Sequence, residues 1–255
     1  MKTIKSTVKN VISSNKIISE IFYSFFKDKV SIKVRDRSIS YYMNPLFGRT
    51  LQGIDINGEY EGPFLSRLIE DLLDFKGEIC YLDIGGGFGL DILVVNSFLK
   101  EKGSYFTFEP DKFSQIYLRK NVAGIPIKIV EKFVGDKSGK DSITIDDFCR
   151  IENIKPTHIK IDIEGAEIYA LKGMLDTIKS CKPRLYIEFH EIFIRNRLKL
   201  DRSAIQEFFR TLSEFGYEIE FNSHHYPLFS GSSEVYDYSW LSDKPNDILY
   251  AVVCK

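Results

Sequence analysis

Residues 81–90 read Tyr-Leu-Asp-Ile-Gly-Gly-Gly-Phe-Gly-Leu, with four glycines directly after an apolar run. An apolar run followed by glycines is typical of a buried strand and a tight turn into a helix. Glycine lets the backbone of such a turn approach a ligand closely, and the first N–H groups of the helix point towards that ligand. The stretch therefore predicts a strand–turn–helix unit that binds a ligand at the carboxyl end of the strand.

Two common phosphate-binding motifs do not fit this turn. The dinucleotide motif G-x-G-x-x-G needs a glycine where the chain has Leu90, and the P-loop needs G-K-[S/T], whereas Gly139-Lys140 is followed by Asp141. Glu109 follows the turn by roughly 25 residues, where a carboxylate can accept hydrogen bonds from both hydroxyls of a ribose. A ribose without a 5′-phosphate indicates an adenosyl ligand.

Helical and strand-like stretches alternate from Phe64 onward, which is typical of a parallel sheet with crossover helices. Five strands are predicted, at Ile79–Ile84, Tyr105–Glu109, Ile127–Val134, His158–Ile163 and Arg184–His190. A helix at 202–215 and two closing strands, at 216–221 and 248–254, follow them. We therefore expect an N-terminal extension over residues 1–57 and an α/β domain over residues 58–255.

The composition suits one large core, because 44% of the 255 residues are hydrophobic. The 35 Lys and Arg residues nearly balance 36 Asp and Glu residues, so no nucleic-acid partner is expected, and a small molecule or glycan is the expected substrate. The scattered cysteines form no C-x-x-C pair, which predicts reduced thiols in a cytoplasmic protein. No apolar run reaches the roughly 20 residues of a transmembrane segment, and no signal peptide is expected.

The N-terminal extension is predicted to begin with an amphipathic helix. Apolar residues in 1–28 are spaced three and four apart among lysines, and residues 30–43 alternate as in a hairpin. The apolar stripe needs a cover. We expect the chain's own domain or a second subunit of a homodimer to provide it, and peripheral contact with an anionic membrane surface through residues 1–28 is the alternative.

Several blocks of sequence together resemble one enzyme family. They are DIGGGFG at 83–89, FEPD at 108–111, Asn121, VGDKSG at 134–139, TIDDF at 144–148, IKIDIEGAE at 159–167, LKGM at 171–174 and KPRLYIEFHE at 182–191. From about Gly58 to Glu191 the chain resembles the FkbM family of S-adenosylmethionine-dependent methyltransferases. The resemblance implies a Rossmann-like sheet of seven strands with the last one antiparallel, and methyl transfer to a hydroxyl oxygen, often of a sugar. The family commonly has Gly-Ala-Asn-x-Gly in the turn, so a contact made by that asparagine is absent here.

The cofactor, S-adenosylmethionine, is expected at the turn and at the ends of the neighbouring strands. The expected glycine contacts are Gly85, Gly87 and Gly89. Glu109 would bind the ribose, with capping of the next helix as its alternative role. Asp83 would orient the methionine amino group or hold the turn through backbone N–H groups. Asp136 is a candidate for the adenine, with a plain turn residue as the equal alternative.

The candidates for catalysis are Asp162, Glu164, Glu188 and His190. Asp162 and Glu164 follow the fourth strand, and Glu167 lies in the next helix, at the edge where open α/β sheets bind ligands. Such close carboxylates repel one another unless substrate hydroxyls, the cofactor's ammonium group or a divalent cation lies among them. Lys160 is expected to lie too deep in the strand to supply the positive charge among these carboxylates.

A divalent metal, Mg²⁺ or Mn²⁺, is one hypothesis for this edge. Glu188 and His190 lie two residues apart on one face of a strand, and together with Asp162 they offer oxygen and nitrogen ligands. A plain general base, Glu188 or His190, is the alternative, and so is a histidine that only forms a hydrogen bond at a strand end.

The long segment between the last two strands carries many aromatic residues and the pair His224-His225. It is predicted to form a sugar-binding wall, with a plain cover of the sheet edge as the alternative.

Two functions other than methyl transfer remain as alternatives. Leu90 argues against a nicotinamide-dependent oxidoreductase, and the intact carboxylates after the fourth strand argue against a non-catalytic interaction module.

Overall fold

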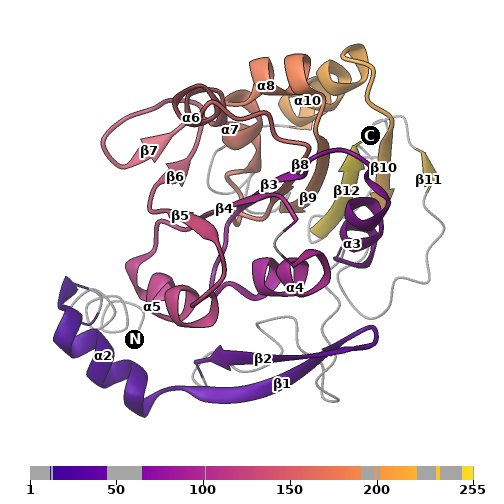
Figure 1. Ribbon diagram of the computed structural model, residues 1–255. Coiled ribbons are helices and arrows are strands. Elements are labelled where there is room, and N and C mark those ends of the chain that lie inside the picture. The colour runs from indigo at the N-terminus through magenta and orange to yellow at the C-terminus, as the bar shows by residue number, and fades with distance from the viewer. Residues whose placement is uncertain are drawn as a thin grey trace.

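The computed structural model describes residues 12, 14–44, 65–100, 102–190, 199, 202–222, 234–235 and 249–254. They form an α/β fold around a central sheet, which confirms the predicted fold class (Figure 1). The order of strands in this sheet is β11-β10-β12-β9-β8-β3-β4-β5. Its strands are β3 (Cys80–Ile84), β4 (Ser104–Phe108), β5 (Ile127–Val130), β8 (His158–Ile161), β9 (Arg184–His190), β10 (Ile219–Asn222), β11 (Glu234–Val235) and β12 (Leu249–Cys254).

The sheet is mostly parallel. Strands β9, β8, β3, β4 and β5 pair in parallel, whereas β12 pairs antiparallel with both β9 and β10. The described residues give eight strands rather than seven, because the two-residue β11 pairs with β10 at the edge. The carboxyl ends of the five parallel strands meet at one edge of the sheet, which is where ligands bind in folds of this kind.

One predicted strand is shorter than expected. The sequence predicts a strand over Ile127–Val134, but β5 ends at Val130, which pairs with the last residue of β4. Later residues therefore have no strand beside them in this sheet. They form β6 (Phe133–Val134), which pairs instead with β7 (Ser142–Ile143) in a separate two-stranded sheet.

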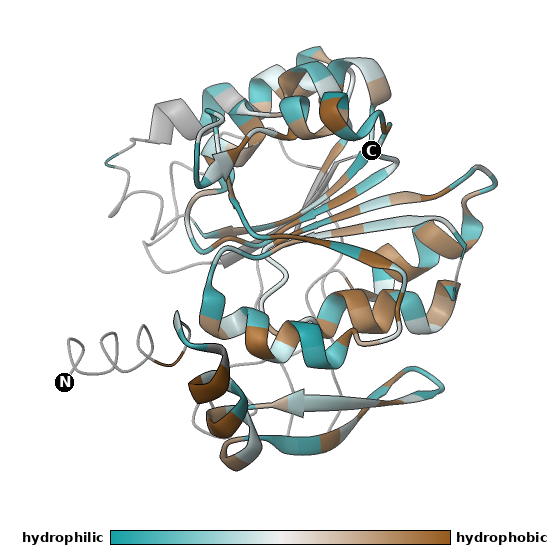
Figure 2. Cartoon of the chain, turned by 60° about the vertical axis from the view of Figure 1, so that its left-hand side comes forward, coloured by the Kyte–Doolittle hydropathy of each residue, from teal (hydrophilic) through white to brown (hydrophobic). Residues whose placement is uncertain are grey.

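Helices cover both faces of the sheet (Figure 2). One layer contains α6 (Ile145–Glu152), α7 (Glu167–Lys172), α8 (Leu175–Cys181) and α10 (Arg202–Glu214). The other layer contains α3 (Leu65–Asp74), α4 (Leu90–Leu99) and α5 (Lys112–Asn121). Each layer shares its own apolar cluster with the sheet, so the fold is a three-layer α/β sandwich.

The strands contribute side chains to both apolar clusters because successive side chains point to opposite faces of the sheet. In β3, Leu82 and Ile84 belong to the cluster under α6–α10, whereas Tyr81 belongs to the cluster under α3–α5. Both faces are buried, which explains why these strands are apolar throughout. A polar side chain on such a strand is therefore unusual, and Asp83 and Lys160 are two examples that are buried.

The N-terminal region adds a helix and a hairpin below the second helix layer. Helix α2 (Lys16–Phe25) precedes the antiparallel pair β1 (Asp28–Val34) and β2 (Arg37–Met43). Ile32 and Tyr41 of the hairpin lie in the same apolar cluster as α3 and α4. The hairpin therefore shares a core with the α/β domain. The domain boundary after residue 57 stays a prediction.

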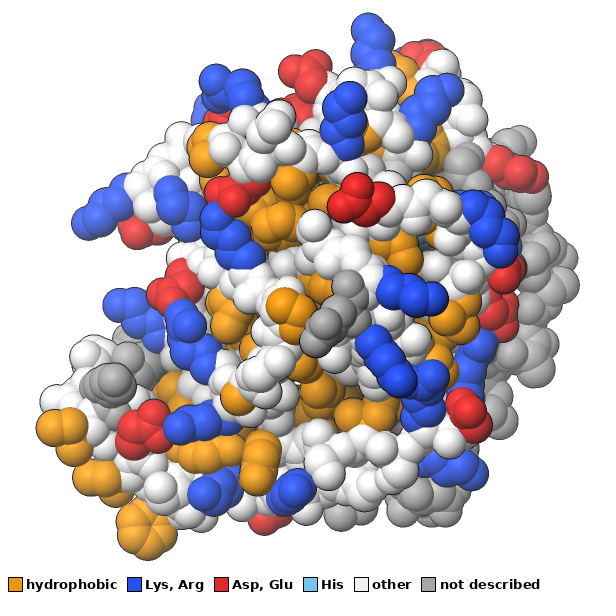
Figure 3. All heavy atoms as spheres, viewed as in Figure 1, with side chains coloured by type: hydrophobic (Ala, Val, Ile, Leu, Met, Phe, Trp, Pro, Cys, Tyr) orange, Lys and Arg blue, Asp and Glu red, His pale blue; other side chains and the backbone are white. Residues whose placement is uncertain are grey.

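Helix α2 packs on the domain through one side only. Its Tyr23 lies against Tyr117 of α5 with ring centroids 5.4 Å apart. On its other side Ile17 is 71% exposed and Phe25 is 78% exposed. Figure 3 shows hydrophobic side chains at the surface in the lower left corner, where Figure 1 places α2. What covers this apolar side, a homodimer partner or a membrane surface, stays a prediction. Among the helices that the structure describes, none is both long and apolar enough to cross a bilayer.

Candidate active site

The glycine turn joins β3 to α4 at the carboxyl edge of the sheet. Gly85 has a φ of +95°, and a Cβ at this position would lie 1.8 Å from the carbonyl oxygen of Asp162, so a side chain there would collide with the neighbouring strand end. Gly87 has a φ of +50°, and a Cβ there would meet no heavy atom within 4 Å. Gly89 precedes α4 as its N-cap. The turn therefore packs closely at Gly85 and leaves open space at Gly87.

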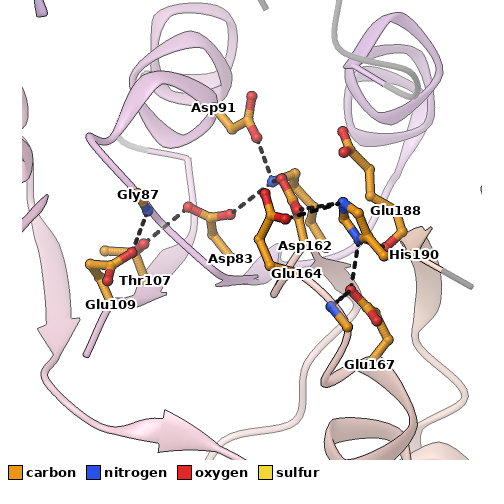
Figure 4. Close-up of polar contacts among 12 residues, drawn as sticks. Asp83, Gly87, Asp91, Thr107, Glu109, Asp162, Glu164, Glu167, Glu188 and His190 are labelled. Carbon is orange, nitrogen blue, oxygen red and sulfur yellow. Dashed lines mark hydrogen bonds and ion pairs between the residues drawn. The ribbon is translucent and has the colours of Figure 1, made fainter. Parts of the chain in front are cut away.

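Glu109 braces this turn from the end of β4. Its Oε2 accepts a hydrogen bond from the backbone N–H of Gly87 at 2.7 Å (Figure 4), and its Oε1 accepts one from the N–H of Asp111 at 2.7 Å. The side chain is only 8% exposed. Burial raises the pKa of Glu109 to about 7, although the two backbone N–H groups oppose the shift. The carboxylate thus holds both the glycine turn and the start of α5, where Asp111 is the N-cap.

A row of buried polar side chains crosses three neighbouring strands beneath the turn. Asp83 of β3 pairs in register with Thr107 of β4 and with Lys160 of β8. Thr107 donates its hydroxyl to Asp83 Oδ2 at 3.0 Å, and Lys160 Nζ lies 3.8 Å from Asp83 Oδ1. Asp83 makes no hydrogen bond to the backbone of the turn among the described residues. Its second expected role, holding the turn through N–H groups, is therefore not observed.

Lys160 is the positive charge among the carboxylates, contrary to the prediction that it would lie too deep. Its Nζ lies 2.5 Å from Asp91 Oδ2 of α4 and 3.5 Å from Asp162 Oδ2. The long side chain starts below the strand end and reaches up to it. Burial alone would lower the pKa of Lys160, but Asp91, Asp162 and Asp83 outweigh burial and raise it well above its usual range. Lys160 therefore stays charged and neutralises part of this edge.

A second group lies beside the first, where β8 and β9 end. One ligand atom from each of Asp162, Glu188 and His190 lies within 4.8 Å of the others. His190 Nε2 is 3.9 Å from Asp162 Oδ1 and 3.9 Å from Glu164 Oε2. The structure thus brings together all four residues that the sequence suggests for catalysis. Their chemical roles stay proposals.

Glu167 orients His190 from the opposite side. Its Oε1 lies 2.8 Å from His190 Nδ1 and accepts a hydrogen bond from the N–H of Gly165 at 3.0 Å, and the side chain is fully buried. Burial lowers the pKa of His190, but the hydrogen bond to Glu167 and the nearby carboxylates raise it overall to about 9. Burial, followed by the charge of Asp162, raises the pKa of Glu188 well above its usual range.

Asp136 does not join either group. It lies exposed in the turn between β6 and β7, and its side chain has no hydrogen bond or ion pair with any residue that the structure describes. A contact between Asp136 and adenine stays a prediction. The predicted aromatic wall and the pair His224-His225 lie outside the described residues.

Sequence reasoning missed several residues that shape the site, namely Asp91, Thr107, Lys160 and the orienting role of Glu167. A signal was present for Lys160, because a charged residue in an otherwise apolar buried strand needs a partner. Asn121 belonged to the family blocks, but no role was expected for it. Its Nδ2 donates to the carbonyls of Tyr42 at 2.8 Å and Phe88 at 2.9 Å, and it therefore ties the hairpin to the glycine turn.

The comparison with family models covers the part of this site that contains Asp162, Glu188 and His190. Residues 123–219 match the model of the methyltransferase FkbM domain. This segment of the chain is similar to the FkbM methyltransferase domain. This match confirms the resemblance seen in the motifs. The matched FkbM segment contains Asp162, Glu188 and His190 but begins after the glycine turn and Glu109. No curated protein matches the chain.

Three solved structures resemble the chain in fold. Methyltransferase FkbM from Methylobacillus flagellatus KT is 23% identical with a TM-score of 0.45, over 68% of this chain and 43% of that one, so this chain spans less than half of its length. The O-methyltransferase from Bacillus cereus in complex with SAH is 14% identical with a TM-score of 0.47, over 82% of this chain and 88% of that one. Precorrin-6y C5,15-methyltransferase from Geobacter metallireducens GS-15 is 13% identical with a TM-score of 0.45, over 75% and 85%. Likenesses at this level do not identify a substrate.

Proposed function

We propose that this protein is an S-adenosylmethionine-dependent methyltransferase that methylates a hydroxyl of a sugar, a glycan or a related small molecule. The observation that carries the proposal is the buried Glu109 carboxylate, bonded to the N–H of Gly87 beside the open space at that glycine. The match to the FkbM domain supports methyl transfer as the reaction. The hydroxyl acceptor is our extension, from the carboxylates and the histidine at the adjacent strand ends.

The residues at the turn fit an adenosyl cofactor. Each oxygen of Glu109 accepts one backbone hydrogen bond, so each retains a lone pair for a ribose hydroxyl. Asp83 Oδ1 is buried without a hydrogen bond among the described residues, and it can accept one from the amino group of the cofactor. The open space at Gly87 lets the ligand approach the backbone closely. These residues would hold S-adenosylmethionine above the carboxyl ends of β3 and β4.

Bound S-adenosylmethionine supplies a methyl carbon attached to a sulfonium, which is already a good leaving group. The chain itself has to hold the acceptor oxygen in line with that carbon and accept its proton, because an aliphatic hydroxyl is a poor nucleophile near neutral pH. Asp162, Glu164, Glu188 and His190 lie together at the neighbouring strand ends and are the groups that would bind the acceptor hydroxyl. Lys160 would hold the side chains of Asp83 and Asp162 in place through its positive charge.

Calorimetric titration with S-adenosylhomocysteine tests the cofactor. We expect micromolar affinity for the parent, and a loss of at least about tenfold for Glu109→Ala, because charge-assisted hydrogen bonds to the ribose are removed. Glu78→Ala is the matched control, since Glu78 is exposed and lies on the loop before β3. An unchanged affinity in Glu109→Ala would remove the central assignment.

The acceptor is tested by transfer of a radiolabelled methyl group to a panel of free sugars, nucleotide sugars and lipid-linked sugars. Label in a product that resists mild base but is lost on ether cleavage would support O-methylation. Label on an amine or carboxylate acceptor, with none on any hydroxyl compound, would contradict the hydroxyl acceptor and leave the cofactor assignment intact.

A further inference from the structure

The ligand atoms of Asp162, Glu188 and His190 are close enough to share one metal ion. They lie within 4.8 Å of one another, and the pair His190 Nε2 and Asp162 Oδ1 is 3.9 Å apart. Two ligands on opposite sides of an ion, each bound at about 2.1 Å, are about 4.2 Å apart. Three ligand atoms spaced evenly around an ion are about 3.6 Å apart, so shifts of up to roughly 0.7 Å in each side chain would bring all three atoms onto a common ion.

The histidine is held in the manner of a metal ligand. A ligating histidine usually gives its other ring nitrogen to a carboxylate, which fixes the tautomer and the orientation of the ring. Glu167 occupies that position at 2.8 Å from His190 Nδ1, and it is itself held by the N–H of Gly165. The geometry directs Nε2 towards Asp162 and Glu164.

Glu188 is an independent sign that this edge of the sheet binds a cation. Its side chain is 8% exposed, and its carboxylate forms no hydrogen bond or ion pair within the described part of the chain. Leaving a carboxylate in such a place without a partner is costly. The charge of Lys160 also acts on Glu188, but Lys160 makes its ion pairs with Asp91, Asp83 and Asp162.

The balance of charge across the edge points the same way. Its carboxylates are Asp83, Asp91, Asp162, Glu164, Glu167 and Glu188, and its basic groups are Lys160 and His190. Carboxylates outnumber basic groups around Lys160 and around His190 alike, and Glu164, Glu167 and Glu188 lie at the His190 end, away from the glycine turn (Figure 4). A cofactor held by Glu109 would leave this end uncompensated.

We propose that Asp162, Glu188 and His190 bind a divalent cation that accepts both oxygen and nitrogen ligands, with Glu167 as the residue that positions His190. Mn²⁺ suits this mixture of carboxylate and imidazole ligands. This proposal rests on the proposed function. The cation would bind the acceptor hydroxyl and lower its pKa, so that the hydroxyl proton passes to solvent water as the new carbon–oxygen bond forms. The carbon–sulfur bond breaks with its electron pair on sulfur, and S-adenosylhomocysteine leaves. Glu164, 65% exposed at its side chain, lies on the side from which the acceptor would approach.

Electron paramagnetic resonance of Mn²⁺ tests this site without an activity assay. The free ion gives a six-line signal that disappears on binding, so titration of chelator-treated protein gives a dissociation constant and a number of sites. We expect one site per chain with micromolar affinity. Glu188→Gln and His190→Gln should each weaken it by at least about tenfold, and Glu167→Gln by about tenfold through the lost orientation. Glu78→Gln, an exposed glutamate, should leave it unchanged.

Absence of Mn²⁺ binding by the parent would overturn the proposal, and so would binding that Glu188→Gln and His190→Gln leave unaltered. Thermal unfolding would show whether a variant is folded. Where a variant is not folded, Mn²⁺ binding by the parent protein still tests the proposal. Calorimetry with S-adenosylhomocysteine on the same chelator-treated samples separates the two proposals. Cofactor binding without Mn²⁺ binding would reject the metal site alone, whereas Mn²⁺ binding without cofactor binding would reject the proposed methyl transfer.

Discussion

The affinity of the parent for S-adenosylhomocysteine should rise with pH through the pKa of Glu109. This carboxyl has a pKa of about 7 because it is buried, whereas its ordinary value is 4.5. The ribose hydroxyls need an ionised carboxylate as their acceptor. Below its pKa, Glu109 must therefore lose a proton before the ligand binds, and the apparent affinity falls with the ionised fraction.

The size of this effect follows from the titration. With a pKa of about 7, the ionised fraction is about 3% at about pH 5.5 and about 97% at about pH 8.5. The dissociation constant should therefore fall about 30-fold over this range, equal to about 2 kcal/mol. Asp83 has a pKa of about 6 through burial and adds a smaller step at the acid end.

The same shift makes an opposite prediction for the stability of the free protein. The folded pKa of Glu109 lies above its unfolded value, so the native state holds an extra proton between about pH 4.5 and 7. Stability therefore falls as the pH rises through this window, by at most about 3 kcal/mol from this group. Ligand binding and stability should thus change in opposite directions.

Calorimetry across this pH range, with Glu109→Gln as the perturbation, checks both statements. Glutamine keeps the shape but cannot titrate and places an N–H₂ group against a backbone N–H, so we expect weaker binding and no step near pH 7. Glu78→Gln controls for the loss of an exposed carboxylate. A parent affinity that is flat with pH, or a step near pH 7 that survives in Glu109→Gln, would refute the assignment of Glu109 to the ribose.

Three further substitutions test the framework of the site by urea unfolding. Asp71→Ala leaves the buried hydroxyl of Tyr186 without its 2.6 Å partner and should cost about 2 kcal/mol. Asn121→Ala removes the tie between Tyr42 and the carbonyl of Phe88 and should cost about 2 kcal/mol while also weakening cofactor binding. Lys160→Met leaves Asp83 and Asp91 without their ion pairs and should cost about 3–5 kcal/mol near neutral pH, with a smaller loss in acid as Asp83, whose pKa burial raises to about 6, becomes protonated.

The exposed residue Asp74 gives the control for the first of these, because Asp74→Ala removes a carboxylate from the same helix without a buried partner. Equal stability of Asp71→Ala and Asp74→Ala would contradict the role assigned to the buried hydrogen bond. For Asn121→Ala, unaltered cofactor affinity would show that the turn does not need the hairpin. For Lys160→Met, a loss that is the same at acid and neutral pH would exclude a charge effect.

The sequence by itself determined the fold class and the elements around the glycine turn. Strands and helices each have a characteristic spacing of apolar residues along the chain, and a tight turn with positive φ favours glycine. Both features can therefore be predicted without knowing which residues are neighbours in space. The convergence of Asp162, Glu188 and His190 also followed, since carboxyl ends of parallel strands share one edge and residues two apart share one face.

Only the tertiary structure decided which charges meet. Asp83, Lys160 and Thr107 are neighbours through the register of three strands that are far apart in the chain, and no local pattern specifies that register. The bond of Glu167 to His190 joins a helix to a strand, and the tie of Asn121 to Phe88 joins a helix to the glycine turn. The sequence does not specify which carboxylates pair with a buried lysine such as Lys160. These partners depend on the strands and helices that pack around it, because a buried charge can pair only with groups that the fold brings within reach.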